Sequence, residues 1–255
     1  MLSATPSNLR LLHITDPHLH SDAESRMHGV VTFDTFRAVI QQAMLNTQPP
    51  DAIIATGDLT HDGTVAGYRL FQSVLAPLNT PVLCIPGNHD APNIMTSVLN
   101  DAPFQVNGLY RAHGWLLIML NSFSDGIVAG HLGPAELERL HNTLHGNPST
   151  PALICLHHHP LPIGSRWLDD IALQNPDELF AIIDAAPQVC GVLWGHVHQA
   201  SDRQRNDIRL ISSPSTCSQF RPNSDNFAID TRPPGFRWLD LLADGTIETE
   251  AIWLD

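Results

Sequence analysis

The sequence has no long run of apolar residues and few basic residues. A membrane-spanning helix needs about 18 or more consecutive apolar residues, so we expect no transmembrane segment. Only 13 Lys and Arg stand against 26 Asp and Glu, and the formal net charge is −13. Nucleic-acid binding depends largely on neutralising phosphate with basic side chains. The composition therefore argues against DNA or RNA as a partner.

Cysteine is also scarce: there are 4, with no C-x-x-C spacing. Cys84, Cys155 and Cys190 lie inside apolar, strand-like runs, which favours reduced core residues over disulfides or metal ligands. The first segment, Met1 to Asn8, is short and polar and lacks the basic and apolar regions of an export signal. These features together predict a cytoplasmic protein.

Histidine, in contrast, is abundant, with 15 residues in a chain of 255. So many imidazoles are unusual for an ordinary surface and natural for a metal site. The hydrophobic fraction of 43% is typical of a globular protein that buries a large core. No linker or internal repeat interrupts the pattern, and we expect a single domain over residues 1–255.

Strand and helix patterns alternate through the first part of the chain, with Thr32 as the expected N-cap of the first helix. Strands are predicted at 10–16, 51–57, 81–85, 152–156 and 189–194, and a hairpin over 109–121. Helices are predicted at 32–47, 64–75, after Pro92, at 134–145 and at 176–185. From Ile208 onward only strands are expected, at 209–212, 226–230, 236–242 and 246–254. The pattern predicts an α/β fold of four layers, α/β/β/α, in which two mixed sheets pack face to face.

Polar residues follow the C-terminal ends of five predicted strands. They are Asp16 and His18, Gly57-Asp58, Gly87-Asn88-His89-Asp90, His157-His158-His159, and His196 with His198. In open α/β sheets, ligands bind beyond the carboxyl ends of strands, so these side chains should converge. Each motif alone also fits a turn or a solvated loop. Their ordered occurrence after apolar strands predicts a metal site suited to Fe, Mn or Zn.

The ordered series resembles the calcineurin-like metallophosphoesterase superfamily over residues 10–200. A finer resemblance is to the class III cyclic-nucleotide phosphodiesterases, in particular the bacterial 3′,5′-cyclic-AMP phosphodiesterase branch. It rests on four segments of the sequence, at 57–63, 157–162, 165–169 and 213–220. The resemblance implies the metallophosphoesterase fold and a binuclear metal centre.

The resemblance also implies the ligands of each metal. One ion would be held by Asp16, His18 and His198, and the other by Asn88, His157 and His196. Asp58 would bridge the two, since a carboxylate can bind two cations about 3.5–4 Å apart. Iron and manganese are expected, and zinc or cobalt would fit the same donors.

A catalytic role is implied for His89, which follows the expected ligand Asn88 but would not bind metal itself. His89 would stabilise the phosphoryl group or protonate the leaving ribose oxygen. Asp90 would orient His89 through a hydrogen bond, although it could equally be an Asx-type turn residue. Besides His89 and Asn88, the metal ligands His18 and His198 are expected to contact the substrate.

The implied reaction is hydrolysis of 3′,5′-cyclic AMP to 5′-AMP by a hydroxide that bridges the metals. An alternative is a broader phosphodiesterase for glycerophosphodiesters or 2′,3′-cyclic nucleotides. A non-catalytic protein-binding scaffold should have lost metal ligands, and this chain retains all of them. Relatives in the superfamily imply that a homodimer could form, while no feature of the sequence requires one.

Other polar residues have two readings. His20, His61, Asp62, His158 and His159 could support the substrate or the metal ligands, or could be ordinary loop, helix-capping and carbonyl-bonding residues. Trp167, Arg166 and Arg221 could belong to a nucleotide pocket, or could be packing and solvent-exposed residues. His13 is expected to be a satisfied core histidine. His28, His113, His131, His141 and His145 have no site context, and the long loop 164–176 is a candidate cover for the site.

Overall fold

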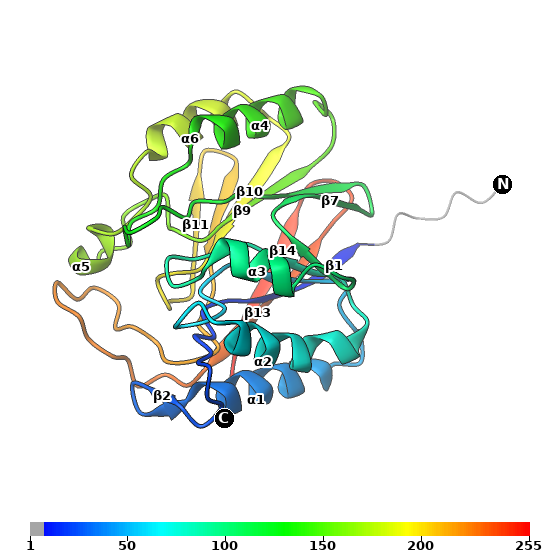
Figure 1. Cartoon of the computed structure of the whole chain (residues 1–255). Coiled ribbons are helices and arrows are strands. Elements are labelled where there is room, and N and C mark those ends of the chain that lie inside the picture. The colour runs from blue at the N-terminus through cyan, green and yellow to red at the C-terminus, as the bar shows by residue number, and fades with distance from the viewer. Residues whose placement is uncertain (1–7) are drawn as a thin grey trace.

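The computed structural model describes residues 8–255 and contains two six-stranded sheets (Figure 1). The first sheet consists of β1 (Leu9–Ile14), β4 (Ala52–Ala55), β5 (Val82–Cys84), β6 (Phe104–Val106), β13 (Gly235–Leu241) and β14 (Ile247–Trp253). The second sheet consists of β7 (Gly108–Ala112), β8 (Trp115–Met119), β9 (Ala152–Leu156), β10 (Val189–Trp194), β11 (Ser201–Arg205) and β12 (Ile208–Ser212). A small hairpin joins β2 (Arg26–Met27) to β3 (Val30–Val31).

Helices cover the outer faces of both sheets. They are α1 (Thr32–Met44), α2 (Val65–Leu75), the 3-10 turn η1 (Ala76–Leu78), α3 (Pro92–Val98), α4 (Pro134–His145), α5 (Arg166–Asp169) and α6 (Pro176–Asp184). In Figure 1, α4 and α6 lie at the top and α1 and α2 at the bottom, with the sheets between them. The predicted four-layer α/β/β/α architecture with two mixed sheets is confirmed.

The strand order brings the polar strand ends to one edge. The first sheet runs β14-β13-β1-β4-β5-β6, and β1, β4, β5 and β6 are parallel. The second runs β11-β12-β10-β9-β8-β7, and β8, β9, β10 and β12 are parallel. Because parallel neighbours end at the same edge of a sheet, each sheet presents a row of carboxyl ends there.

The core follows from the alternation of side chains along each strand. Leu9 and Leu11 of β1 pack in the cluster between the sheets, together with residues such as Leu153 of β9. Leu12 and Ile14, on the opposite face of β1, pack with α1 and α2. Both faces of the central strands are therefore buried, and β4, β5 and β9 are apolar throughout, whereas β1 also contains Arg10 and His13.

Several sequence predictions differ from the structure. Thr32 is the first residue of α1 rather than its N-cap, and Val31 at the cap position makes no side-chain bond. The strand predicted at 226–230 is wrong: this stretch contributes only an isolated bridge between Phe220 and Ile229. The segment pairs with neither six-stranded sheet, and its largest apolar side chain, Phe227, is exposed. The edge strands β6 and β11 were not predicted.

The four cysteines are free, as expected. Cys84 and Cys155 are buried as predicted, whereas Cys190, also predicted in the core, is only half-buried, and Cys217 is buried without having been predicted. Among the helices of residues 8–255, none has the length and apolarity that a bilayer crossing requires. The prediction about an export signal falls mainly on residues 1–7, which lie outside the described part of the chain. The prediction of a single domain over residues 1–255 stays a prediction.

Candidate metal centre

The residues expected as metal ligands come from five strand ends and meet between the two sheets. The first sheet contributes Asp16 and His18 after β1, Asp58 after β4 and Asn88 after β5. The second sheet contributes His157 after β9, and His196 and His198 after β10. All are buried except Asn88, which is half-buried.

The backbone at these positions is unusual. Five of the expected ligands have a left-handed backbone with positive φ: Asp16 (52°), His18 (46°), Asp58 (48°), His196 (67°) and His198 (46°). Non-glycine residues rarely adopt this conformation, and such strain concentrates at functional sites. Backbone hydrogen bonds hold the turns in place, including Asp16 N to Gly57 O at 3.1 Å. The strand ends are therefore bent sharply in order to point their side chains at one another.

Asp16, His18 and His198 form the first cluster of donor atoms. The Nε2 atoms of His18 and His198 are 3.2 Å apart, and His198 Nε2 is 3.3 Å from Asp16 Oδ1. Ligands held about 2.0–2.3 Å from one ion lie roughly 3–4 Å from each other. The three donors therefore have the spacing of ligands that share a cation.

Asn88, His157 and His196 form the second cluster. His157 Nε2 lies 3.2 Å from both Asn88 Oδ1 and His196 Nδ1. Asp58 lies between the clusters, because its Oδ2 is 3.5 Å from His157 Nε2 and 3.7 Å from His18 Nε2. A carboxylate in this position can contact an ion on either side.

Hydrogen bonds to backbone carbonyls orient two of the imidazoles. Nδ1–H of His157 donates to Thr56 O at 2.6 Å, and Nδ1–H of His198 donates to Ser218 O at 2.7 Å. Each bond fixes the tautomer that leaves the Nε2 lone pair pointing into its cluster. This is the arrangement that metal-binding histidines require.

The ionisation of these groups also fits a site for cations. Burial lowers the pKa of His18 and His196, which keeps these rings neutral and able to ligate. Burial also lowers the pKa of His157, but the Asp58 carboxylate outweighs it and raises that pKa to about 9. A proton on His157 thus occupies the place of a metal beside Asp58, and metal binding would displace it.

Glycines let the strand ends approach closely. A methyl group at Gly57 would lie 2.5 Å from His157 Nδ1 and 2.6 Å from Gly87 N. A methyl group at Gly87 would overlap the Asp58 carboxylate, and one at Gly195 would overlap the Thr15 hydroxyl. Only glycine fits at these three positions without displacing the donor groups.

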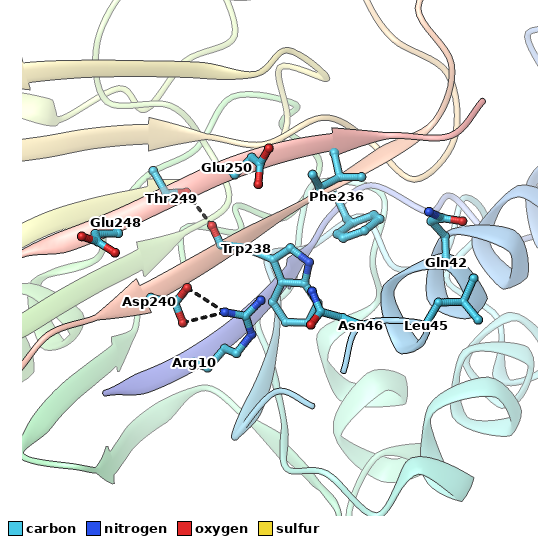
Figure 2. Close-up of a pocket in the computed structure, with 11 residues that line it drawn as sticks. Arg10, Gln42, Leu45, Asn46, Phe236, Trp238, Asp240, Glu248, Thr249 and Glu250 are labelled. Atoms are coloured by element: carbon cyan, nitrogen blue, oxygen red, sulfur yellow. Dashed lines mark hydrogen bonds and ion pairs between the residues drawn. The ribbon is translucent and has the colours of Figure 1, made fainter. Parts of the chain in front are cut away.

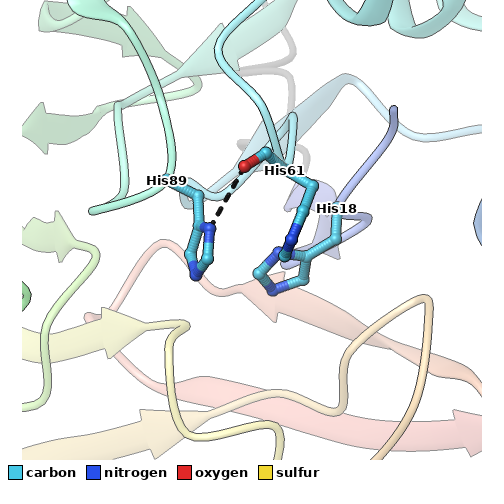
Figure 3. A group of neighbouring side chains, drawn as sticks. All are labelled: His18, His61 and His89. Atoms are coloured by element: carbon cyan, nitrogen blue, oxygen red, sulfur yellow. Dashed lines mark hydrogen bonds between the residues drawn. The ribbon is translucent and has the colours of Figure 1, made fainter. Parts of the chain in front are cut away.

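His89 stands at the edge of the centre with His18 and His61 (Figure 3). Its Nδ1–H donates to the His61 carbonyl at 3.2 Å, and its ring stacks on His61 with centroids 4.7 Å apart. The His89 backbone N–H donates to Asp58 Oδ1 at 2.9 Å. These contacts leave Nε2 of His89 available to a ligand.

The hydrogen bond expected between Asp90 and His89 is not made, and this prediction is corrected. Asp90 instead accepts bonds from the backbone N–H groups of Gly87 (2.9 Å) and Leu59 (3.1 Å) and from the Tyr68 hydroxyl (2.9 Å). None of these bonds goes to the residue two positions ahead, Pro92, which has no N–H, so the alternative Asx-type turn is not formed either. Burial, together with the charge of Asp58, raises the pKa of Asp90 to about 6.

The remaining polar candidates divide between the site and ordinary structure. His13 is buried and bonded to Ser213 and Thr56, as expected of a core histidine. Both ring nitrogens of His158 are engaged, by Ser122 at 2.8 Å and the Val128 carbonyl at 3.0 Å.

His159 is buried 3.6 Å from Asp169. Asp62 accepts a hydrogen bond from the Thr64 hydroxyl ahead of α2, and the His20 ring packs at a tilt against His61 with centroids 4.6 Å apart.

A cavity of about 200 Å³ opens onto the clusters. Besides His18, Asp58, Asn88, His89, His196 and His198, it is lined by Met27, Val128, Trp167, Leu168, Ile171 and Phe220. Neither Arg166 nor Arg221 is among these lining residues, whereas Trp167 is. Of the apolar lining residues, only Trp167 was predicted from the sequence, because the others lie on loops or on elements too short to show a periodic pattern.

A larger cavity, of about 570 Å³, lies elsewhere, between the end of α1 and the β13–β14 hairpin (Figure 2). Its arginine, Arg10, is paired with Asp240 at 2.8 Å and packs 4.4 Å from the Trp238 ring centroid. None of its lining residues belongs to the histidine and carboxylate clusters. We therefore place the candidate metal site in the smaller cavity, which the histidine and carboxylate clusters line.

The fold and the paired histidine and carboxylate clusters are those of a metal-dependent phosphoesterase. The chain belongs to the calcineurin-like phosphoesterase family, whose model matches residues 9–200.

Relatives match the chain over nearly its whole length. A Pseudomonas aeruginosa protein named 3′,5′-cyclic adenosine monophosphate phosphodiesterase CpdA is 37% identical, over 96% of this chain and 90% of that protein. Proteins of the same name from Vibrio vulnificus and Escherichia coli are 40% and 39% identical, over 96% and 97% of this chain and 89% and 90% of the relatives.

Solved structures show the same fold at much lower identity. A dimetal phosphatase from Danio rerio has a TM-score of 0.66 at 13% identity, covering 97% of this chain and 99% of that one. The Thermus thermophilus protein TT1561 has a TM-score of 0.62 at 15% identity, covering 96% and 99%.

Proposed function

We propose that this chain hydrolyses 3′,5′-cyclic AMP to 5′-AMP at a binuclear metal centre. The observation that carries the proposal is its full-length similarity to relatives named as cyclic-AMP phosphodiesterases, at 37–40% identity. The convergence of the histidine and carboxylate donors supports it independently, because a phosphodiester needs strong electrostatic stabilisation during hydrolysis.

We assign the first ion to Asp16, His18 and His198, the second to Asn88, His157 and His196, and the bridging position to Asp58. The donor spacings of 3.2–3.7 Å support this division. Mixed imidazole and oxygen donors suit iron or manganese, and zinc or cobalt fit the same set. When bound, two such ions would acidify a water molecule and offset charge on the phosphoryl oxygens.

The chain itself would hold the substrate and handle a proton. Asn88 offers a neutral oxygen, so it adds no negative charge next to the phosphoryl group. His89, whose Nδ1–H is held by the His61 carbonyl, presents Nε2 to the cavity. In this role Nε2 would protonate the leaving ribose oxygen or bind a phosphoryl oxygen. Asp90 supports this indirectly by fixing the turn that carries both residues.

Comparing turnover on three substrates tests the proposal. Metal-loaded protein should hydrolyse 3′,5′-cyclic AMP faster than 2′,3′-cyclic AMP, with bis(p-nitrophenyl) phosphate as a general phosphodiester. Two metal equivalents per chain are expected in the purified protein by elemental analysis. Turnover of the general substrate without turnover of 3′,5′-cyclic AMP would favour a broader phosphodiesterase. A protein that binds no metal and hydrolyses none of the three would favour a scaffold.

A further inference from the structure

The cavity over the metal centre has two unlike halves. One half consists of the histidine, aspartate and asparagine side chains described above. The other half, which we call the apolar wall, consists of Met27, Val128, Trp167, Leu168, Ile171 and Phe220. These six residues come from the β2–β3 hairpin, the loop after β8, the α5 region and the segment before β13. In Figure 1, α5, β2 and the orange segment before β13 lie along one side of the molecule.

Aromatic rings of the apolar wall contact the side chains of the proposed metal centre directly. Phe220 stacks on the expected ligand His198, with centroids 4.0 Å apart and planes at 9°. Trp167 meets Phe220 edge-on at 5.0 Å, and Phe227 contacts Trp167 at 5.2 Å. Offset and edge-to-face contacts of this kind are favourable aromatic geometries. A flat group held by this cluster would lie next to the phosphoryl site.

Beyond the cavity lining, the apolar wall extends to Phe227 and Ile127, which we count as its outer end, and this end is exposed to solvent. Phe227 and Val128 are 53% and 51% exposed, and Ile127, next to Val128, is 50% exposed. Only two other large hydrophobic side chains, Leu45 and Val65, are exposed within residues 8–255. Single exposed apolar residues are ordinary, but a group beside a cavity marks a surface that binds something.

We propose that the apolar wall binds the nucleobase of the substrate by stacking and apolar contact; this inference rests on the proposed function. The wall gives the base little to hydrogen-bond, because the Nε1–H of Trp167 is its single side-chain N–H or O–H group. That Nε1 is buried and has no hydrogen-bond partner among residues 8–255. One donor can meet acceptors that adenine and guanine share, so the wall should accept either base.

This reading predicts weak discrimination between purines. A site that hydrogen-bonds a substrate group rejects analogues lacking it strongly, whereas an apolar site discriminates weakly. Stacking of a base on an aromatic side chain is likewise tolerant of base identity and contributes about 1–3 kcal/mol. We expect 5′-AMP and 5′-GMP to bind within about threefold of each other, and each to bind much more tightly than ribose 5-phosphate.

Calorimetric titration of the manganese-loaded protein with 5′-AMP and with ribose 5-phosphate tests the wall. Phe227→Ala should weaken 5′-AMP binding roughly five- to a hundredfold and leave ribose 5-phosphate unchanged. Trp167→Leu should act in the same way and provides a second variant. Leu45→Ala removes an even more exposed apolar side chain at the end of α1 and should change neither titration.

Equal binding of 5′-AMP and ribose 5-phosphate to the wild-type protein would overturn the inference. Equal weakening of both ligands by Phe227→Ala and Trp167→Leu would also overturn it. The proposed function fails differently, through absence of 3′,5′-cyclic AMP turnover, even where 5′-AMP binding keeps its dependence on the base. In kinetics on cyclic AMP, the wall variants should raise KM more than they lower kcat.

Discussion

His89 is held from two sides by groups that do not compete for its second nitrogen. Its Nδ1–H is committed to the His61 carbonyl, and its backbone N–H to the Asp58 carboxylate. The ring therefore faces the cavity in a fixed tautomer, which is what a proton donor to the leaving oxygen requires.

Replacing His89 with alanine should lower kcat on 3′,5′-cyclic AMP by about 10²- to 10⁴-fold, the usual contribution of a positioned acid or base. Metal content should stay at the wild-type value, because His89 belongs to neither proposed ligand set. His141→Ala, an exposed histidine on α4, is the matched control and should leave kcat unchanged. Steady-state kinetics with elemental analysis measures both quantities. An unchanged kcat in His89→Ala would exclude His89 from the reaction.

At the scale of single residues, the sequence predicted the polar cluster well because each member follows an apolar strand. The prediction from sequence failed where the hydrogen-bond partner of a side chain depends on the conformation of a turn. The Asp90 carboxylate accepts hydrogen bonds from the backbone of its own turn and from the hydroxyl of Tyr68, which lies 22 residues earlier in the sequence. Phe220 lines the site because its ring stacks on His198, and no sequence period signals such a contact.

The turns between elements depend on glycines that admit neighbouring side chains. Gly87→Ala would place a methyl group against the Asp58 carboxylate and near the His157 ring. We expect this variant to lose metal and more than about 90% of its activity, since donor groups must be held within about 0.5 Å. Gly133→Ala, at the start of α4, has no heavy atom within 4 Å of the new methyl group. This control should keep metal and activity, and wild-type metal content in Gly87→Ala would contradict the packing argument.

The helix α2 begins at a capped turn close to the site. Thr64 accepts a hydrogen bond from Gly67 N at 3.1 Å, and the same helix carries Tyr68, which bonds to Asp90. Thr64→Ala should lower the free energy of unfolding by about 1 kcal/mol, or about 2–4 °C in Tm. Ser73→Ala lies on the exposed face of the same helix and should have little effect. Urea and thermal unfolding measure the stability of both variants. Equal free energies of unfolding for Thr64→Ala and Ser73→Ala would mean that the Thr64 cap does not stabilise the fold.

At the scale of elements, helices with strong apolar periodicity were predicted to within a few residues, as for α2 and α4. The errors in predicting strands lie where tertiary contacts determine whether a segment forms a strand. Residues 226–230 contain a short apolar run between Asn226 and Asp230, but a strand needs a partner, and this stretch makes one isolated bridge. The polar edge strand β11 was missed because its side chains are mostly exposed and its pairing with β12 alone defines it.

The two sheets meet at the metal centre as well as in the core. Four proposed ligands come from the first sheet and three from the second, so bound ions would connect them. The face-to-face packing of the sheets was predictable from apolar strands, whereas the strand order was not. The last strands, β13 and β14, join the first sheet beside β1, a pairing across more than two hundred residues that local pattern cannot reveal.

Removing metal should therefore destabilise the whole molecule and not only the active centre. Ions that bind the folded state at about 100 times their Kd stabilise it by about 2.7 kcal/mol. For a chain of this size, that corresponds to a loss of about 5–10 °C in Tm on chelation, measured by calorimetry and reversed by manganese. Asp58→Asn removes the charge between the two clusters while keeping the side chain's size, so its Tm should respond little to chelator or manganese. His141→Ala should respond like the wild type. A full manganese-dependent shift in Asp58→Asn would mean that the stabilising ions bind elsewhere and do not join the two sheets.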